Sequence, residues 1–317
     1  MKKLIGLVLV FLVLYGALMT MLPSASLAQS NFNLARNVGV YGLISLGVGV
    51  LIISGGIDLS IGSFIGLCAT VLAVGVQRKG WSPGAAIGVV FLLAVAVGLL
   101  HGLLVTKAKL QPFVVTLCGL FIYRGLARWY GEDTNAGVGA EELAGFRYVF
   151  ADFQFLGLPV QFWYLLGAVA VFGVLMHKSV YGRYLFAIGS NDLAAKYSGI
   201  HVDRYRILAY VLCSVSAAFF SILYLAEINT AQPASTGAWM ELYAIAGAVL
   251  GGCSLRGGEG TIAGIVFGTA ILFVLKTAVI IAGVPDELEY TAIGVTLLFG
   301  AMLDEFLRRR NPAVRKA

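Results

Sequence analysis

A short stretch of glycine and polar residues, 54–63, interrupts two apolar runs that are each long enough to enter a bilayer. It contains three glycines and the carboxylate of Asp58. Non-helical backbone is tolerated at membrane depth only where it is buried in protein or lines a water-filled cavity. An acid in such a place is expensive and usually has a function. The segment therefore predicts a membrane protein in which a broken helix shapes a polar pathway.

The composition indicates a polytopic membrane protein. Of the 317 residues, 59% are hydrophobic and only 12% are charged, whereas about 25% of a soluble domain is charged. The mean hydropathy is +0.90, and apolar runs recur near the roughly 20-residue length that crosses a bilayer. We therefore expect an all-α protein with one transmembrane domain over residues 1–317. The net charge of +6 does not indicate nucleic-acid binding, because the basic residues cluster at the ends of the apolar runs.

Ten apolar runs are candidate transmembrane helices. The second and the eighth are short, and each ends at a Gly-Gly pair. The first is longer than the roughly 7–15 apolar residues of a signal peptide, so we favour a retained helix over a cleaved signal. The runs cover residues 4–22, 38–54, 60–76, 84–105, 112–130, 160–177, 207–226, 242–253, 260–282 and 289–306.

The charges between the runs predict that both termini face the cytoplasm. An even number of helices places the two termini on the same side. Most lysines and arginines, such as Lys178, fall on that side, whereas acids such as Glu132 fall on the other. This distribution follows the positive-inside rule. Arg78 and Lys79 are a local exception, because they fall on the outer side.

Two loops are long enough to carry structure of their own. The outer loop, about residues 131–159, is either an external cap or a simple connector. The inner loop, about 178–206, contains a short stretch with the signals of a capped helix. Ser190 or Asn191 suits the N-cap and Gly199 suits the helix stop. Such a helix lying along the membrane suits docking into a cytoplasmic partner, which we favour over a solvated connector.

The chain also contains a candidate internal repeat. Residues 55–60 have a counterpart in residues 251–256, because each segment begins with a Gly-Gly pair after a short apolar run. An even number of crossings separates the two segments, so the repeats would be parallel and related by an axis along the membrane normal. The alternative is a chance similarity in a glycine-rich chain. Paired broken helices in two halves indicate a translocation pathway.

No motif for catalysis or metal binding occurs in the sequence. It has no Gly-x-x-x-x-Gly-Lys-[Ser/Thr] phosphate loop, no His-Glu-x-x-His and no Gly-x-Ser-x-Gly pattern. The four cysteines have no paired spacing, so we expect neither a metal site nor disulfides. Histidines 101, 177 and 201 fall near predicted cytoplasmic span ends, where we expect ordinary interfacial roles.

Three charged residues fall within or between the spans. Arg124 and Lys276 lie in the outer halves of their predicted helices. For both we favour snorkelling to the external interface, or pairing with an acid there, over a place along a substrate pathway. Asp58 lies in a segment of glycines and hydroxyl residues rather than in a regular helix. We favour a helix-capping role in which its carboxylate accepts a backbone N–H near Leu59 or Ser60. The alternative is a gating or substrate-contacting role.

Several segments in order resemble one transporter family. Residues 54–63, 109–117, 123–126, 189–200, 231–233 and 251–264 together resemble the ribose/xylose/galactose-type permease subunits of bacterial ABC importers, in the branched-chain amino acid/ribose permease superfamily. The resemblance covers about residues 31–307. The sequence departs from the family's pattern at Cys253 and Arg256, which leaves the substrate open.

The resemblance implies a ten-helix permease in the lipid of the bacterial inner membrane. It would pair with a second permease copy or a paralogue and with cytoplasmic ATP-binding subunits. A periplasmic or lipid-anchored sugar-binding protein would deliver the substrate. ATP and Mg would bind to the partner ATPase, with no cofactor in this chain and no nucleic-acid partner. The permease would move a monosaccharide by alternating access.

The residues expected to matter form two groups. The ATPase-coupling loop, implied by the resemblance, contains Gly182, Gly189, Asn191, Ala194, Ala195, Ser198 and Gly199. The broken-helix motifs contain Gly55, Gly56, Asp58, Ser60, Gly62, Gly251, Gly252, Gly257 and Gly258. Alternatives to sugar import are a permease for nucleosides or branched-chain amino acids and an ion-coupled secondary transporter. A membrane-embedded enzyme ranks last.

Overall fold

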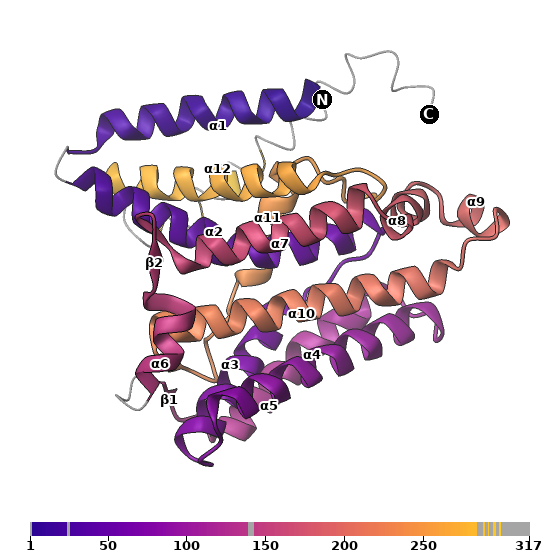
Figure 1. Cartoon of the computed structure of the whole chain (residues 1–317). Helices are drawn as coiled ribbons and strands as arrows, with labels where there is room; N and C mark the ends of the chain where they lie inside the picture. The colour runs from indigo at the N-terminus through magenta and orange to yellow at the C-terminus, as the bar shows by residue number, and fades with distance from the viewer. Residues whose placement is uncertain are drawn as a thin grey trace.

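The computed structural model describes residues 2–23, 26–138 and 143–283, together with five single positions beyond 287. The described chain is a bundle of helices that lie side by side (Figure 1). Its principal helices are α1 (Lys2–Met21), α2 (Leu27–Ile53), α3 (Ile61–Gln77), α4 (Pro83–Thr106), α5 (Pro112–Gly131), α7 (Val160–His177), α10 (Val202–Ile228), α11 (Met240–Leu250) and α12 (Ile262–Ile281).

Short elements close the two ends of the bundle. At the end on the left of Figure 1, the antiparallel pairs are β1 (Ala136–Gly137) with β4 (Thr230–Ala231) and β2 (Gln154–Phe155) with β3 (Leu158–Pro159), beside α6 (Ala144–Arg147) and η3 (Tyr148–Asp152). At the opposite end lie α8 (Val180–Ser190) and α9 (Asp192–Tyr197). We call these the strand end and the elbow end.

Six of the described helices are long and apolar enough to cross a membrane: α1, α2, α4, α7, α10 and α12. Helices α3 and α11 are apolar but shorter. Helix α2 is the central one, since 83% of its most apolar window is buried inside the protein, against 6% for α1. Around α2 pack α7, α10, α11 and α12, and the exposed apolar side chains of α1 face outward. This distribution is that of a helical membrane protein, in which lipid covers the outer faces.

Most predicted spans coincide with helices, but the second does not. Helix α2 begins at Leu27 rather than near residue 38, so it has 27 residues and is not short. Its first turns carry polar side chains that find partners on other helices: the Tyr15 hydroxyl donates to Asn31, and Arg36 pairs with Glu227 at 3.5 Å. The eighth span is short as predicted, with 11 residues. The tenth, 289–306, lies outside the continuously described residues.

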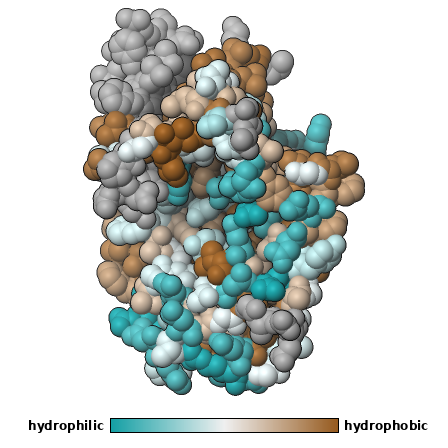
Figure 2. Space-filling model, turned by 90° about the vertical axis from the view of Figure 1, so that its left-hand side faces the viewer, coloured by the Kyte–Doolittle hydropathy of each residue, from teal (hydrophilic) through white to brown (hydrophobic). Residues whose placement is uncertain are grey.

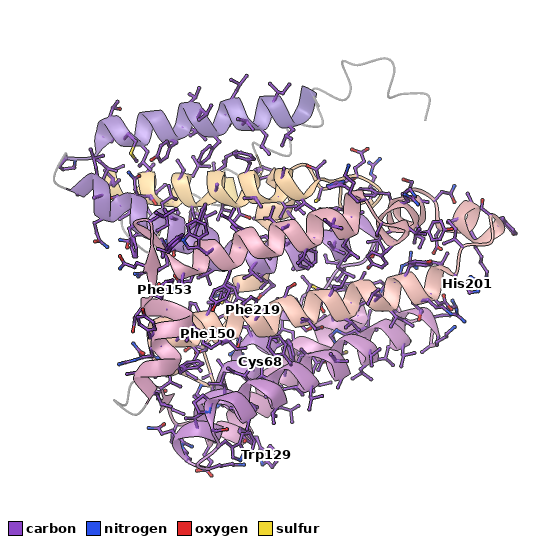
Figure 3. The ribbon with its side chains drawn as sticks, in the orientation of Figure 1. Cys68, Trp129, Phe150, Phe153, His201 and Phe219 are labelled. Carbon is purple, nitrogen blue, oxygen red and sulfur yellow. The ribbon has the colours of Figure 1, made fainter. Side chains whose placement is uncertain are left out.

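The described residues of the loop 131–159 pack onto the bundle at the strand end, and an external position of this loop stays a prediction. The Phe150 ring stacks on Tyr164 of α7 with centroids 6.1 Å apart, and Tyr164 meets Phe219 of α10 edge-on at 5.3 Å. Figure 3 shows Phe150, Phe153 and Phe219 near this junction. Figure 2 looks onto the strand end, where hydrophilic residues gather over the centre and hydrophobic residues lie along the flanks.

Close packing of α4 against α10 depends on two glycines of α4. A Cβ added at Gly98 would lie 2.5 Å from the Cα of Val211, and one at Gly102 would lie 2.8 Å from the Cα of Ile207. Both contacts are with backbone, which cannot rotate away. Small residues at such positions let helices approach closely, and van der Waals packing is a main source of helix association in membranes.

This contact gives a prediction about stability. The Gly98→Ala variant should be destabilised by roughly 1–3 kcal/mol, because the new methyl group forces α4 and α10 apart. In thermal unfolding of the detergent-purified protein, its melting temperature should fall. The control is Gly88→Ala on the same helix, where an added Cβ meets nothing within 4 Å. The control should be neutral or stabilised by its better helix propensity. Equal shifts in the two variants would contradict this account.

Candidate functional site

The break between α2 and α3 is held by hydrogen bonds within its own residues. The Ser54 hydroxyl donates to the Leu51 carbonyl at 2.6 Å, and the Gly56 N–H donates to the same oxygen at 3.0 Å. Gly55 has a φ of +79°, a left-handed conformation that favours glycine. These bonds satisfy carbonyls that the end of a helix leaves unpaired.

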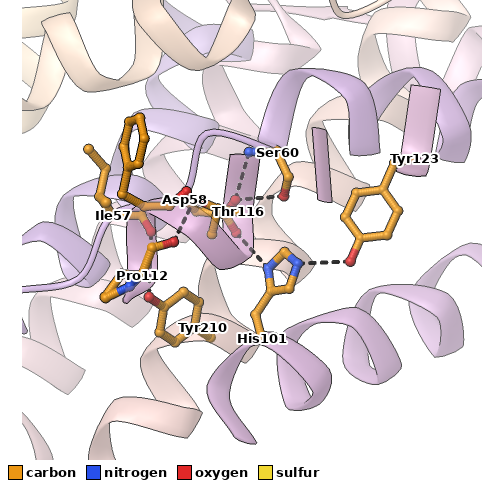
Figure 4. Close-up of polar contacts among 9 residues, drawn as sticks. Ile57, Asp58, Ser60, His101, Pro112, Thr116, Tyr123 and Tyr210 are labelled. Carbon is orange, nitrogen blue, oxygen red and sulfur yellow. Dashed lines mark hydrogen bonds and ion pairs between the residues drawn. The ribbon is translucent and has the colours of Figure 1, made fainter. Parts of the chain in front are cut away.

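A buried polar network surrounds Asp58 in this break (Figure 4). One carboxylate oxygen accepts from the Ser60 backbone N–H at 2.8 Å and from its hydroxyl at 2.6 Å. The other lies 3.2 Å from Nδ1 of His101 on α4, and His101 Nε2 lies 2.8 Å from the hydroxyl of Tyr123 on α5. Asp58 and His101 are each about 1% exposed. The network therefore ties the break to α4 and α5.

The hydrogen-bonding pattern is complete if Nδ1 of the imidazole donates to Asp58. Nε2 then accepts the proton of the Tyr123 hydroxyl. The side chains of Ser60, Asp58, His101 and Tyr123 are thereby linked in one series of hydrogen bonds. A fully satisfied buried network stiffens the segment that it connects. Asp58 accepts an N–H at Ser60, which is the contact that the capping hypothesis requires, although the N-cap residue of α3 is Ser60 itself.

The expected interfacial role of His101 is wrong. This histidine is buried and faces the carboxylate of Asp58, whereas His201 is exposed near α9 at the elbow end (Figure 3). The position of His101 near a span end did not predict its burial, because its ring points from α4 into the protein. The signal that the sequence did offer was the presence of one acid and one histidine inside apolar segments, since such groups usually pair with one another.

The break between α11 and α12 ends its preceding helix in a similar way. Gly251 is the C-cap of α11 and Gly252 has a φ of +89°, as Ser54 and Gly55 do after α2. The matching glycines are thus Gly55 and Gly252, one residue out of register with the alignment of the two Gly-Gly pairs. The second break is longer and contains three further glycines with positive φ: Gly257, Gly258 and Gly260. The internal repeat beyond these helix ends stays a prediction.

The two breaks touch each other and α8. The Gly258 N–H donates to the Ile53 carbonyl at 2.9 Å. A Cβ added at Gly257 would lie 3.0 Å from the Cα of Gly55, and one at Gly189 would lie 1.9 Å from the Ile53 oxygen. The fold therefore brings together Gly55, Gly189, Gly257 and Gly258 from the two predicted groups. We call this contact the glycine junction.

Gly62 lies away from the junction, beside the segment that precedes α11. A Cβ added at Gly62 would lie 2.4 Å from the Gly237 carbonyl oxygen and 2.0 Å from the Glu241 carboxylate. Arg124 of α5 donates to the carbonyls of Pro233 and Thr236 at 3.1 and 2.8 Å in the same segment. The expected snorkelling of Arg124 is therefore wrong, because its guanidinium holds main-chain carbonyls inside the protein.

Helix α9 is capped as the sequence predicts. The Asn191 side chain accepts the Ala194 N–H at 2.9 Å, and Gly199 ends the helix with a φ of +81°. Ser198 closes the last turn, since its hydroxyl donates to the Ala194 carbonyl at 2.9 Å. Upstream, Gly182 lets α8 pass close to α7, because a Cβ there would meet the Met176 carbonyl at 2.0 Å.

The two faces of α9 differ sharply. Ala195 is buried against Ile188 and Val202, so it fixes the helix to the protein. Leu193 and Tyr197 are 67% and 89% exposed, and Ala194 is exposed beside them. An apolar and aromatic face left uncovered on a short, firmly attached helix is a surface suited to a partner.

A cavity of about 970 Å³ opens near the ends of α3 and α5, with Lys79, Trp129 and Tyr130 in its lining. Figure 3 shows Trp129 at the edge of the bundle. Arg128 binds both carboxylate oxygens of Asp133, and these hydrogen bonds hold the pKa of Asp133 below its usual value. The Lys79 ammonium lies 4.3 Å from the centre of the Tyr130 ring. Arg128 and Asp133, two charged residues of this lining, are therefore partners of each other.

The described residues by themselves indicate the class of protein to which the chain belongs. They form a multi-pass helical membrane protein with two touching helix breaks and, at one end, a short helix with an exposed apolar face. In the part of the chain that the structure describes, no group of three His, Cys, Asp or Glu side chains is placed to hold a metal ion.

Comparison with known proteins places the chain in a family. Residues 30–301 match the family of the branched-chain amino acid transport system permease component. The ribose import permease protein RbsC of Bacillus subtilis is 36% identical over 272 residues, which cover 86% of this chain and 83% of the relative. A probable ABC transporter permease protein of Sinorhizobium fredii is 32% identical over 300 residues, covering 93% and 87%.

A third relative has a different named substrate. The autoinducer 2 import system permease protein LsrD of Escherichia coli is 34% identical over 260 residues, which cover 81% of this chain and 78% of the relative. No solved structure matches the chain. The chain belongs to this permease family, and it is an ABC transporter permease component: a transport subunit rather than an enzyme.

The Asp58 network gives a second prediction. Asp58→Ala should destabilise the protein by about 1–3 kcal/mol, because Ser60 and His101 lose a buried acceptor. Asp58→Asn keeps one acceptor oxygen, so its melting temperature should fall less and much of the uptake should remain. Thermal unfolding and transport in reconstituted vesicles measure both effects, with Asp152→Asn at an exposed position as the control. Normal folding of Asp58→Asn with complete loss of uptake would instead assign Asp58 a direct role in transport.

Proposed function

We propose that the chain is the transmembrane permease of a bacterial ABC importer that moves a monosaccharide across the inner membrane. Support for the substrate class comes from its relatives, since ribose import permeases align over most of the chain. The single observation that carries an ATP-driven mechanism is the exposed face of α9, held rigidly by Ala195 at the end opposite the strand pairs.

The partners follow from this assignment. Two cytoplasmic ATPase subunits would bind ATP and Mg and contact α9, and a second copy or paralogue of the permease would complete the pathway. A periplasmic or lipid-anchored binding protein would dock at the strand end, where Figure 2 shows a hydrophilic surface. Transport would proceed by alternating access around the two helix breaks, because irregular backbone between packed helices is a natural place for a pathway.

The docking role of α9 is tested by charge. In Ala194→Glu combined with Tyr197→Glu, two acids replace the exposed apolar face, which should prevent contact with an apolar groove on the ATPase. We expect loss of the ATPase subunit from the purified complex and loss of stimulated ATP hydrolysis, with normal membrane insertion. The control is Leu156→Glu, an exposed residue (77%) at the opposite end, which should retain the ATPase subunit in the purified complex. Retention of the ATPase by the double variant would exclude α9 as the docking element.

The substrate class is tested on the partner that selects it. The binding protein that works with this permease should bind ribose or a related monosaccharide, measured by calorimetry against autoinducer 2, nucleosides and branched-chain amino acids. Uptake by the reconstituted complex should show the same preference. Autoinducer 2 is the second candidate, because LsrD is 34% identical to this chain. Binding of only an amino acid or nucleoside would contradict the assignment to sugars.

A further inference from the structure

Arg206, in the second turn of α10, lies between the docking helix and the first helix break. One of its terminal nitrogens donates to the Asp192 carboxylate at 3.2 Å, and the other donates to the Ser54 carbonyl at 3.4 Å. Asp192 is the first residue of α9, and Ser54 is the C-cap of α2. One planar guanidinium thus contacts two segments that are far apart in sequence.

The two ends of this bridge differ in burial. The side chain of Arg206 is 18% exposed and that of Asp192 is 52% exposed. A partly exposed ion pair contributes little to stability, with a median of about 0–1 kcal/mol. The bridge is therefore more important for the relative positions of α9 and the end of α2 than for the free energy of unfolding. Guanidinium suits such a role, because its rigid fork fixes two acceptors in a defined relation.

The glycine junction supplies a second contact between the same regions. Ser190, the last residue of α8, directly precedes the N-cap of α9, and a Cβ added at Gly258 would lie 2.3 Å from its hydroxyl oxygen. Gly189 leaves no room for a side chain between α8, the Ile53 carbonyl and Gly258. Because packed backbones do not compress, a displacement of the α8–α9 elbow must displace both breaks or separate from them.

We propose that Arg206 and Gly189 are positioning residues that transmit movement of the α8–α9 elbow to the helix breaks after α2 and α11. At Gly189 the backbone of α8 is in direct contact with the backbone of both breaks, so movement of the elbow toward the breaks displaces them. The two hydrogen bonds of Arg206 join α9 to the carbonyl end of α2, so movement of α9 away from the breaks draws the end of α2 with it. The inference rests on the proposed function, because the force on the elbow would come from the ATPase.

The test separates coupling from docking. The permease is reconstituted with its ATPase and binding protein, and uptake per ATP hydrolysed is measured. Arg206→Ala should lower this ratio at least about threefold, the scale on which coupling positions act, while stimulated ATP hydrolysis and subunit retention persist. Arg206→Lys, which reaches one acceptor at a time, should be intermediate. Gly189→Ala should also lower the ratio by separating α8 from the breaks.

Arg204→Ala is the matched control, because Arg204 is an exposed arginine of α10 only two residues before Arg206. It should leave the ratio unchanged. Asp192→Ala removes the exposed half of the bridge and leaves Arg206 in place. It therefore tests the bridge even if the Arg206 variants fail to fold. An unchanged ratio in both Arg206→Ala and Asp192→Ala, or an equal loss of hydrolysis and uptake, would overturn the proposal.

A second measurement needs no partner protein. Backbone amide exchange in residues 52–58 of the purified permease should be faster in Arg206→Ala than in wild type or Arg204→Ala, with little change in melting temperature. Unchanged exchange would show that Arg206 does not hold the break. Failure of the proposed function looks different: the wild-type chain would then retain no ATPase and stimulate no hydrolysis, whatever the state of residue 206.

Discussion

The structure depends on satisfying the backbone at the end of α2. A helix that stops inside a membrane protein leaves carbonyls without partners, and hydrocarbon offers none. Here Ser54 and Gly56 bond to the Leu51 carbonyl, Gly258 bonds to that of Ile53, and Tyr210 of α10 donates to that of Ile57 at 3.4 Å. The second break and α10 thus each add one hydrogen bond to those that the first break makes within its own residues.

The same requirement explains why glycines crowd the junction. Donors on one backbone reach carbonyls on another only where no side chain intervenes, and Gly189 meets Ile53 at a distance that any Cβ would block. The result is a solid contact rather than an open channel at this level. Movement of one segment must then be accompanied by movement of the others, which is the property that the proposed alternating access requires.

The sequence predicted elements bounded by strong signals and missed those set by distant partners. Helices α4, α5 and α7 begin and end within one residue of their predicted bounds. Their starts were predicted well because proline is the first residue of α4 and α5 and directly precedes α7. The start of α2 was missed, since its polar first turns read as a loop and are sustained by contacts with other helices. Capping of α9 was predicted from local residues alone. The pairing of Asp58 with His101 was not, because 43 residues separate them.

The buried acid also bears on the choice between transport mechanisms. An ion-coupled transporter needs a carboxylate that a proton or cation can reach and leave. Asp58 already uses one oxygen for Ser60 and the other for His101, and both residues are almost completely buried. A cation arriving there would have to displace the hydrogen bonds that Ser60 and His101 make to the carboxylate, and each buried polar group left without its partner costs about 1–3 kcal/mol. The geometry therefore favours a permease whose driving force enters elsewhere, as the proposed docking of an ATPase on the exposed face of α9 requires.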